Sequence, residues 1–169
     1  MSVGTTVELF LPFSGGHCQL PSLAQPRVAH SLDFPVICGG YDQWRSCVQL
    51  AGSEWVSLGS SLLYARYYHL SWRSASGLTL AGGLGSGALT TETLSSDGTS
   101  LETFSLRNST VSACAISLPD SLLITGGFET LTSALLYDIT GFLQDLPSLN
   151  TGRHDHGCSH YLDEEGSPV

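Results

Sequence analysis

The stretch FPVICGG, residues 34–40, decides how this chain is organised. A short apolar run ends there at two glycines, Gly39 and Gly40. The combination returns as LTLAGG at residues 78–83 and as LLITGG at residues 122–127, so the glycine doublets follow one another at intervals of 43 and 44 residues. A fixed period of roughly 40 to 50 residues is typical of repeat architectures.

The same segments recur around each doublet. An apolar segment leads into the glycines, a second segment follows them (SCVQL, TTETLSS and SALLYD), and a turn that contains glycine leads to a further short segment. No segment shows the helical periodicity of apolar residues, whereas short segments between glycine turns favour strands. We therefore expect an all-β fold with four short strands in each repeat.

An R-x-x-H pattern lies upstream of the doublets. It reads Arg27 to His30, Arg66 to His69 and Arg153 to His156. One repeat departs from the pattern, because Thr110 and Ala113 occupy these positions there.

Four strands in about 43 residues are typical of a β-propeller blade. The glycine doublet, a downstream Tyr-Asp such as Tyr137-Asp138, and a Trp-x-x-Leu such as Trp55 to Leu58 resemble the kelch repeat. The resemblance implies a partial kelch-type β-propeller, with about three four-stranded blades and a half-blade at each end. We expect a fragment of a larger propeller, because an open one would leave long unpaired strand edges.

The repeats divide the chain, taken as a single partial propeller over residues 1–169, into five parts. Residues 1–23 supply strands C and D of a preceding blade, residues 24–62, 63–107 and 108–150 are blades, and residues 151–169 begin a further blade.

The recurrence of the doublets indicates a structural role for their glycines. A tight corner where a Cβ atom would clash, or where φ is positive, favours glycine. We expect this role at all six positions, namely Gly39, Gly40, Gly82, Gly83, Gly126 and Gly127.

Composition disfavours several classes of partner. The net charge is −9, all six basic residues are arginines, and they do not cluster. Nucleic acid and anionic membrane are therefore poor candidates. No apolar run approaches the roughly 20 residues of a membrane span. The sequence also lacks G-x-S-x-G, H-E-x-x-H and P-loop motifs, so we expect neither an enzyme nor a cofactor site.

Two groups of residues are candidates for binding a protein partner. Arg27, Arg66 and Arg153 stand in loops that resemble the partner-binding face of kelch propellers, where they would suit an acidic peptide. The alternative is that each arginine pairs with an acidic neighbour or a carbonyl and fixes its blade. The loop YDQWRSC adds Tyr41, Asp42, Trp44 and Arg45; tyrosine, tryptophan and arginine are enriched at binding hot spots.

Cysteine and histidine residues raise two further questions. If the strands around the first doublet form a hairpin, Cys38 lies opposite Cys47, and the pair is either a disulfide or two buried thiols. The sequence leaves the cellular compartment open. In RHDHGCSH, the residues His154, His156, Cys158 and His160 alternate, but a strand-spaced run is too long for all four to meet one ion. We expect no metal site.

Asn108-Ser109-Thr110 is a glycosylation sequon, which has meaning only in a secreted chain. The sequence as a whole predicts a non-catalytic protein–protein interaction module from a larger adaptor or scaffold. The alternative is a fragment of an enzyme related to galactose oxidase, which copper-ligand blades would reveal.

Overall fold

A computed structural model describes residues 5–11, 16–33, 35–74, 76–118, 121–138, 140–141 and 143–158. Within these ranges the chain forms fourteen strands and no helix, and every strand pairing is antiparallel. No helix in the described part could therefore cross a membrane. The all-β class predicted from the sequence is confirmed.

The strands form four sheets in which spatial order follows chain order. The first sheet has two strands, β1 (Val7–Leu11) and β2 (Gly16–Leu20). The second contains β3 (Ser31–Asp33), β4 (Val36–Cys38), β5 (Ser46–Ala51) and β6 (Glu54–Ser61). The third contains β7 (Leu70–Ser74), β8 (Gly77–Ala81), β9 (Thr90–Leu94) and β10 (Ser100–Ser105). The fourth contains β11 (Cys114–Leu118), β12 (Ser121–Thr125), β13 (Ala134–Asp138) and β14 (Leu143–Asp145).

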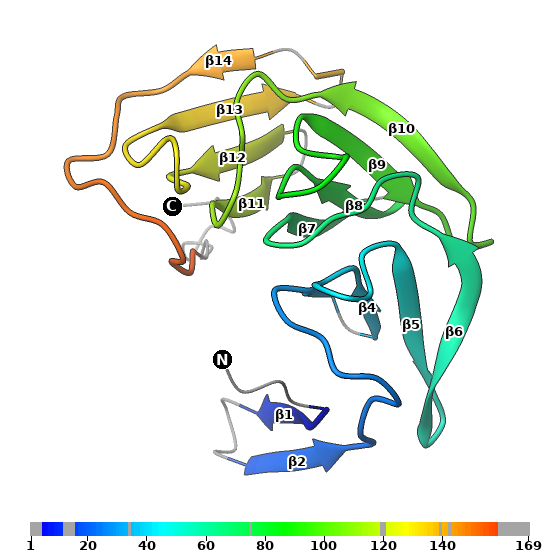
Figure 1. Ribbon diagram of the computed structural model, residues 1–169. Coiled ribbons are helices and arrows are strands. Elements are labelled where there is room, and N and C mark those ends of the chain that lie inside the picture. Colours follow the sequence, from blue (N-terminus) through cyan, green and yellow to red (C-terminus); the bar gives the residue numbers. More distant parts are fainter. Residues whose placement is uncertain are drawn as a thin grey trace, which may run out of the picture.

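The sheets follow one another along an open arc (Figure 1). Strands β7 and β11 lie on the inner side of the arc, and β10 and β14 lie on the outer side. Neighbouring four-stranded sheets touch through their first strands, because β3 contacts β7 and β7 contacts β11. The three four-stranded sheets fall within residues 24–62, 63–107 and 108–150, which are the repeats read from the sequence. No strand occurs in residues 151–158, and the rest of the expected further blade lies outside the described residues.

The hydrophobic core is divided between the sheet interfaces. One cluster joins the second sheet to the third, and another joins the third to the fourth. Their buried members include Val36, Leu62 and Leu80 in the first cluster and Leu70, Ile124 and Tyr137 in the second. The three four-stranded sheets therefore bury apolar side chains where they stack on one another, as the units of repeat proteins do.

The first glycine of each doublet lies in close contact with the segment that begins the next repeat. A Cβ atom on Gly39 would lie 2.7 Å from the carbonyl oxygen of Arg66 and 2.7 Å from Cε1 of His69. Gly126 abuts the backbone carbonyl of Arg153 in the same way, and Gly82 abuts the side chain of Thr110. The doublets therefore recur because each one is a joint between repeats.

Backbone hydrogen bonds cross the same joints. The amide of Gly40 donates to the carbonyl of Arg66 at 3.0 Å, and the amide of Gly127 donates to the carbonyl of Arg153 at 3.1 Å. A second series runs from loop to loop through residues with positive φ. In this series Asp155 donates to Ser112, Ser112 to Tyr68, and Tyr68 to Ala29, at 2.9, 3.2 and 2.9 Å.

The joint predicts a large difference between two glycine substitutions with the same backbone conformation. Gly39 has φ of 63° and Gly52 has φ of 62°, but a Cβ atom on Gly52 would meet nothing within 4 Å. Gly52→Ala should cost roughly 1–2 kcal/mol for the left-handed backbone alone. Gly39→Ala should cost about 1–3 kcal/mol more, because the joint is overpacked. Urea unfolding of both variants measures the difference. Equal losses of stability in the two variants would contradict the close packing at the Gly39 joint.

Candidate functional site

One end of the sheets carries the loops that lead from sheet to sheet and the loops that join the two middle strands of each four-stranded sheet. It comprises residues 21–30, 39–45, 62–69, 82–89, 106–113, 126–133 and 146–158, and we call it the loop face. Short backbone pairings hold these loops together: Tyr41 donates to Val28, Leu84 to Tyr67, and Phe128 to Val111, each at 2.8 Å. These pairings fix two loops within each repeat, and the glycine joints fix the loops of one repeat against those of the next.

Two of the three arginines expected to bind a partner are buried below this face. The side chain of Arg27 donates to the carbonyl of Gly39 at 2.8 Å, and to the carbonyl and hydroxyl of Ser46 at 2.9 and 2.7 Å. Arg27 is 6% exposed and Arg66 is fully buried. The prediction that these two residues contact a partner is therefore wrong. They have the structural role that was the alternative, because each guanidinium donates hydrogen bonds to the loop after its own glycine doublet.

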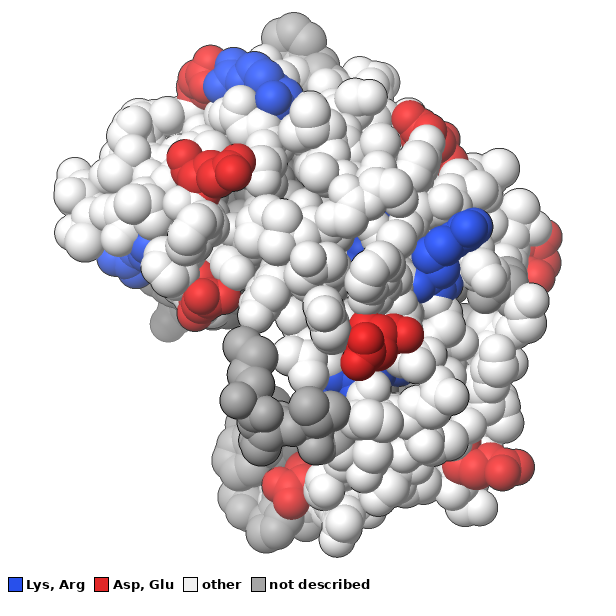
Figure 2. All heavy atoms as spheres, in the orientation of Figure 1, with Lys and Arg blue, Asp and Glu red and all other residues white. Residues whose placement is uncertain are grey.

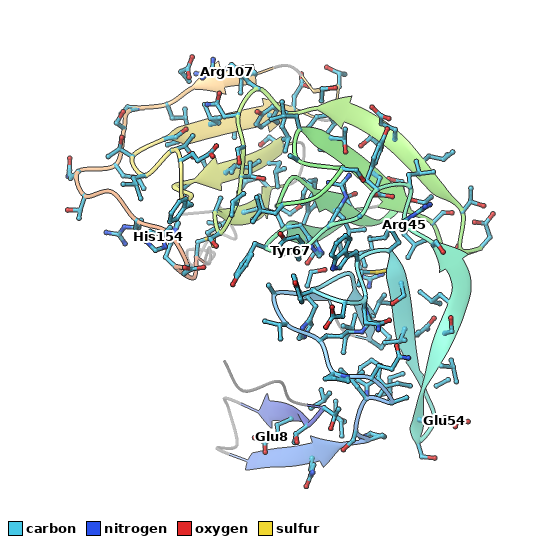
Figure 3. All side chains as sticks on the ribbon, in the orientation of Figure 1. Glu8, Arg45, Glu54, Tyr67, Arg107 and His154 are labelled. Carbon is cyan, nitrogen blue, oxygen red and sulfur yellow. A yellow bond between two sulfur atoms is a disulfide. The ribbon has the colours of Figure 1, made fainter. Side chains whose placement is uncertain are left out.

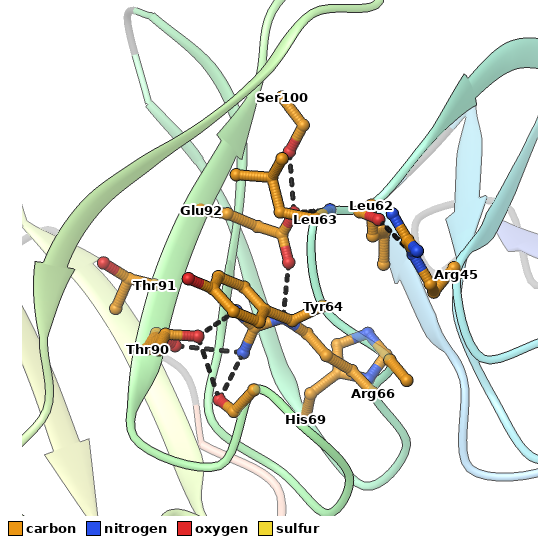
Figure 4. Close-up of polar contacts among 12 residues, drawn as sticks. Arg45, Leu62, Leu63, Tyr64, Arg66, His69, Thr90, Thr91, Glu92 and Ser100 are labelled. Atoms are coloured by element: carbon orange, nitrogen blue, oxygen red, sulfur yellow. Dashed lines mark hydrogen bonds and ion pairs between the residues drawn. The ribbon is translucent and has the colours of Figure 1, made fainter.

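Arg66 makes the most extensive polar contacts in the interior (Figure 4). Its Nε donates to Oε1 of Glu92 at 2.7 Å, and both side chains are fully buried. Its terminal nitrogens donate to three backbone carbonyls and one hydroxyl, those of Gly82, Gly87 and Thr90 and the Thr90 side chain. The second oxygen of Glu92 accepts from the amide of Leu63 at 2.6 Å and from the hydroxyl of Ser100 at 2.7 Å. The ion pair therefore ties the loop entering the third sheet to strands within it.

Truncation of this pair should strongly destabilise the chain. Arg66→Met leaves the Glu92 carboxylate buried without its cation, and such a loss costs about 3–5 kcal/mol. Arg107→Met is the matched control, because Arg107 forms an exposed pair with Asp145 on the outer strand. That substitution should leave the melting temperature nearly unchanged. Thermal unfolding followed by circular dichroism compares them, and a similar effect of both substitutions would contradict the interior role of Arg66.

Two histidines of the R-x-x-H pattern, His69 and His156, each contact the preceding sheet. Nε2 of His69 lies 2.8 Å from Oγ of Ser31 in the preceding sheet, and Nε2 of His156 lies 3.2 Å from Oγ1 of Thr125. Burial, together with the smaller effect of the positive charges of Arg66 and His30, lowers the pKa of His69 from 6.5 to about 3. Folding therefore requires the neutral imidazole at this joint.

This requirement predicts how stability depends on pH. His69 binds a proton below pH 6.5 when the chain is unfolded, but only near pH 3 when it is folded. Stability from this residue is complete above pH 6.5 and is lost progressively as the pH falls toward 3, by about 1.4 kcal/mol per pH unit. His69→Gln should flatten this slope, whereas His154→Gln, at an exposed position, should not. Urea unfolding between pH 7 and 4 measures the slopes, and identical slopes for all three proteins would contradict the assignment.

Four aromatic side chains form a cluster on the loop face. They are Tyr41 and Trp44 from the loop after β4, and Tyr67 and Tyr68 from the loop before β7. The ring centroids of Tyr41, Trp44 and Tyr67 lie 5.7–6.2 Å from one another, which is within the range of favourable aromatic pairs. In Figure 3, Tyr67 lies closer to the inner side of the arc than Arg45 does. We call these four residues the aromatic cluster.

Exposed apolar side chains gather on this face. Nine large hydrophobic residues are exposed in the described part of the chain, and seven of them belong to the loop face, namely Tyr41, Trp44, Leu63, Leu84, Leu89, Phe128 and Leu131. The other two, Val56 and Leu101, lie on outer strands. Tyr41 and Trp44 are 52% and 45% exposed although their rings pack together. Contiguous exposed apolar patches are a feature of many interaction sites.

Charged groups do not gather in the same manner. Acidic and basic side chains are scattered over the side of the molecule seen in Figure 2, and most of that surface carries neither. A shallow hollow beside Phe128 is lined by residues 129–134, 145, 146 and 148. The aromatic cluster is therefore the more distinctive feature of the loop face.

The structure places the remaining predicted binding residues at the surface. Asp42 is exposed beside the aromatic cluster, and Arg45 is exposed while its Nε donates to the carbonyl of Leu62 at 2.6 Å. Arg153 is also exposed, and its contact with a partner stays a prediction. Tyr67 and Tyr68 are not among the residues predicted from the sequence, although they are the two unspecified residues of the pattern from Arg66 to His69.

Four of the five cysteines form disulfides. Cys38 and Cys47 form a disulfide between β4 and β5. The sequence had left a disulfide and two buried thiols as alternatives. Cys114 is bonded to Cys158, which the sequence did not indicate. Cys18 is free and exposed. The described residues contain no group of three or more histidine, cysteine or acidic residues that could hold a metal, and His160 lies outside them.

Comparison with known proteins shows a likeness of fold without a likeness of sequence. No family model and no curated protein matches the sequence. The chain is similar in structure to YjhT. The TM-score is 0.72 at 12% sequence identity, over 82% of this chain and 58% of YjhT. The chain thus spans a little over half the length of that protein, and the likeness concerns the fold alone.

Proposed function

We propose that the chain is part of a kelch-type β-propeller that binds a protein partner through its loop face. The observation that carries this proposal is the concentration of exposed apolar side chains there, with the aromatic cluster among them. Support for the architecture comes from the stacked sheets, the glycine joints at intervals of 43 and 44 residues, and the likeness to YjhT. The binding role would make it a non-catalytic module of a larger adaptor or scaffold protein.

The geometry of the aromatic cluster favours a protein partner over a small molecule. Its rings pack against one another, and Tyr41 and Trp44 are still 52% and 45% exposed, so the cluster keeps much of its apolar surface accessible to a partner. Small-molecule sites are concave and bury most of the ligand. Protein interfaces instead use tyrosine and tryptophan as anchors surrounded by polar residues. Asp42 and Arg45 would supply part of such a polar rim. No observation in the described residues favours the enzyme alternative.

Substitutions in the aromatic cluster should weaken binding selectively. Truncation of an anchoring tryptophan costs about 2 kcal/mol or more, which corresponds to a roughly thirty-fold loss of affinity. Trp44→Ala should therefore reduce capture of the partner from an extract of the native tissue, measured by quantitative mass spectrometry of the retained proteins. Leu101→Ala is the matched control, because it removes an exposed apolar side chain from β10. Capture that depends on Leu101 and not on Trp44 would contradict the proposal.

A further inference from the structure

The loop between β10 and β11 presents one polar side chain between two anchored positions. On one side, Leu106 is buried and its amide donates to Leu89 at 2.8 Å, while Arg107 pairs with Asp145. On the other side, Thr110 is 2% exposed. Asn108 lies between them, partly exposed, and its side chain has no hydrogen-bond partner among the described residues. Asn108 is therefore held at the surface with its amide available.

The folded structure does not explain why residue 110 carries a hydroxyl group. Its Oγ1 is buried, and in the described part of the structure it has no hydrogen-bond partner. A buried hydroxyl without a partner costs stability. The side chain packs directly on Gly82 at the joint between the third and fourth sheets. Valine would fill nearly the same volume there without burying a polar group, so packing explains the shape of residue 110 but not its oxygen.

Thr110 also occupies the position at which the other repeats have arginine. Another residue makes the hydrogen bond that the arginine makes in those repeats. Arg27 and Arg66 each donate to the carbonyl of the first glycine in their own doublet. In the repeat with Thr110, the corresponding carbonyl of Gly126 accepts from Oγ1 of Thr130 at 2.8 Å. The departure from the pattern is thus compensated by a residue 20 positions further along the chain.

The disulfides indicate the environment in which the chain folds. Cys38–Cys47 and Cys114–Cys158 each link two elements of the fold. Disulfides form and persist in oxidising compartments and are rare where thiols are kept reduced. A eukaryotic chain that acquires them in the endoplasmic reticulum meets the enzyme that glycosylates Asn-x-Ser/Thr sequences there.

We propose that Asn108 is an N-glycosylation site, and that the hydroxyl of Thr110 is present because this modification requires it. In the reaction, Nδ2 of Asn108 forms a bond to the anomeric carbon of a lipid-linked oligosaccharide. The bond from that carbon to the lipid pyrophosphate breaks, the lipid pyrophosphate leaves, and the amide loses one proton. The transfer takes place on the entering chain, before Thr110 is buried by folding. The modified position lies in a different loop from Trp44, and the proposal does not depend on the proposed function.

Mass spectrometry of the protein from its native source tests the proposal directly. The peptide that contains Asn108 should carry an oligosaccharide, and amidase treatment should release it and convert Asn108 to aspartate. An unmodified Asn108 throughout the native protein would overturn the proposal.

Substitutions at residue 110 test whether its hydroxyl group is present for glycosylation and not for folding. The variants are expressed in cells that direct the chain to the endoplasmic reticulum, and total cell protein is analysed so that the result does not depend on export. Thr110→Ser should keep the oligosaccharide. Thr110→Val and Asn108→Gln should lose it. In oxidised protein produced without glycosylation, Thr110→Val should unfold at the same temperature as the parent chain or at a higher one. A lower unfolding temperature would show that the hydroxyl serves the fold and would overturn this part.

Discussion

The contact between a glycine doublet and the loop entering the next sheet is the constraint on which the rest of the structure depends. Gly39 can approach the backbone of Arg66 only because it lacks a Cβ atom. That approach allows the amide of Gly40 to reach the Arg66 carbonyl, and it brings His69 against Ser31. The two hydrophobic clusters form between sheets that these contacts place, so neither core exists within a single repeat.

The same constraint explains why the loop face is a defined surface. Loops are generally the variable and mobile parts of a fold. Here, Arg27 and Arg66 hold the loops after the doublets by hydrogen bonds to their backbone, and backbone pairings connect each loop to the next. Tyr41 and Trp44 project from one such loop onto Tyr67 from another. The rigidity needed to present aromatic anchors therefore comes from buried arginines, for which the sequence left both a partner contact and a structural role open.

Features with a short or regular spacing in the chain could be predicted from the sequence. The period of the doublets gave the strands of each sheet, and a hairpin placed Cys38 opposite Cys47. The arginines could not be assigned because their acceptors lie 12 to 26 residues away in the chain, so the pattern alone does not tell burial from exposure. Cys114 and Cys158 are 44 residues apart and meet only after the sheets have stacked. Tyr67 and Tyr68 were visible in the sequence, but their approach to Trp44 depends on the joint.

Native-state hydrogen exchange tests most directly whether the joints hold the sheets in one cooperative structure. The amides to follow are those of Gly40, Tyr68 and Ser112 at the joints, and those of Ile37, Leu80 and Ile124 within the strands. If stacking creates the core, joint and strand amides should exchange through the same global opening, with the same free energy and the same dependence on denaturant. Exchange of the joint amides by a low-energy local opening, while the strand amides stay protected, would contradict the account.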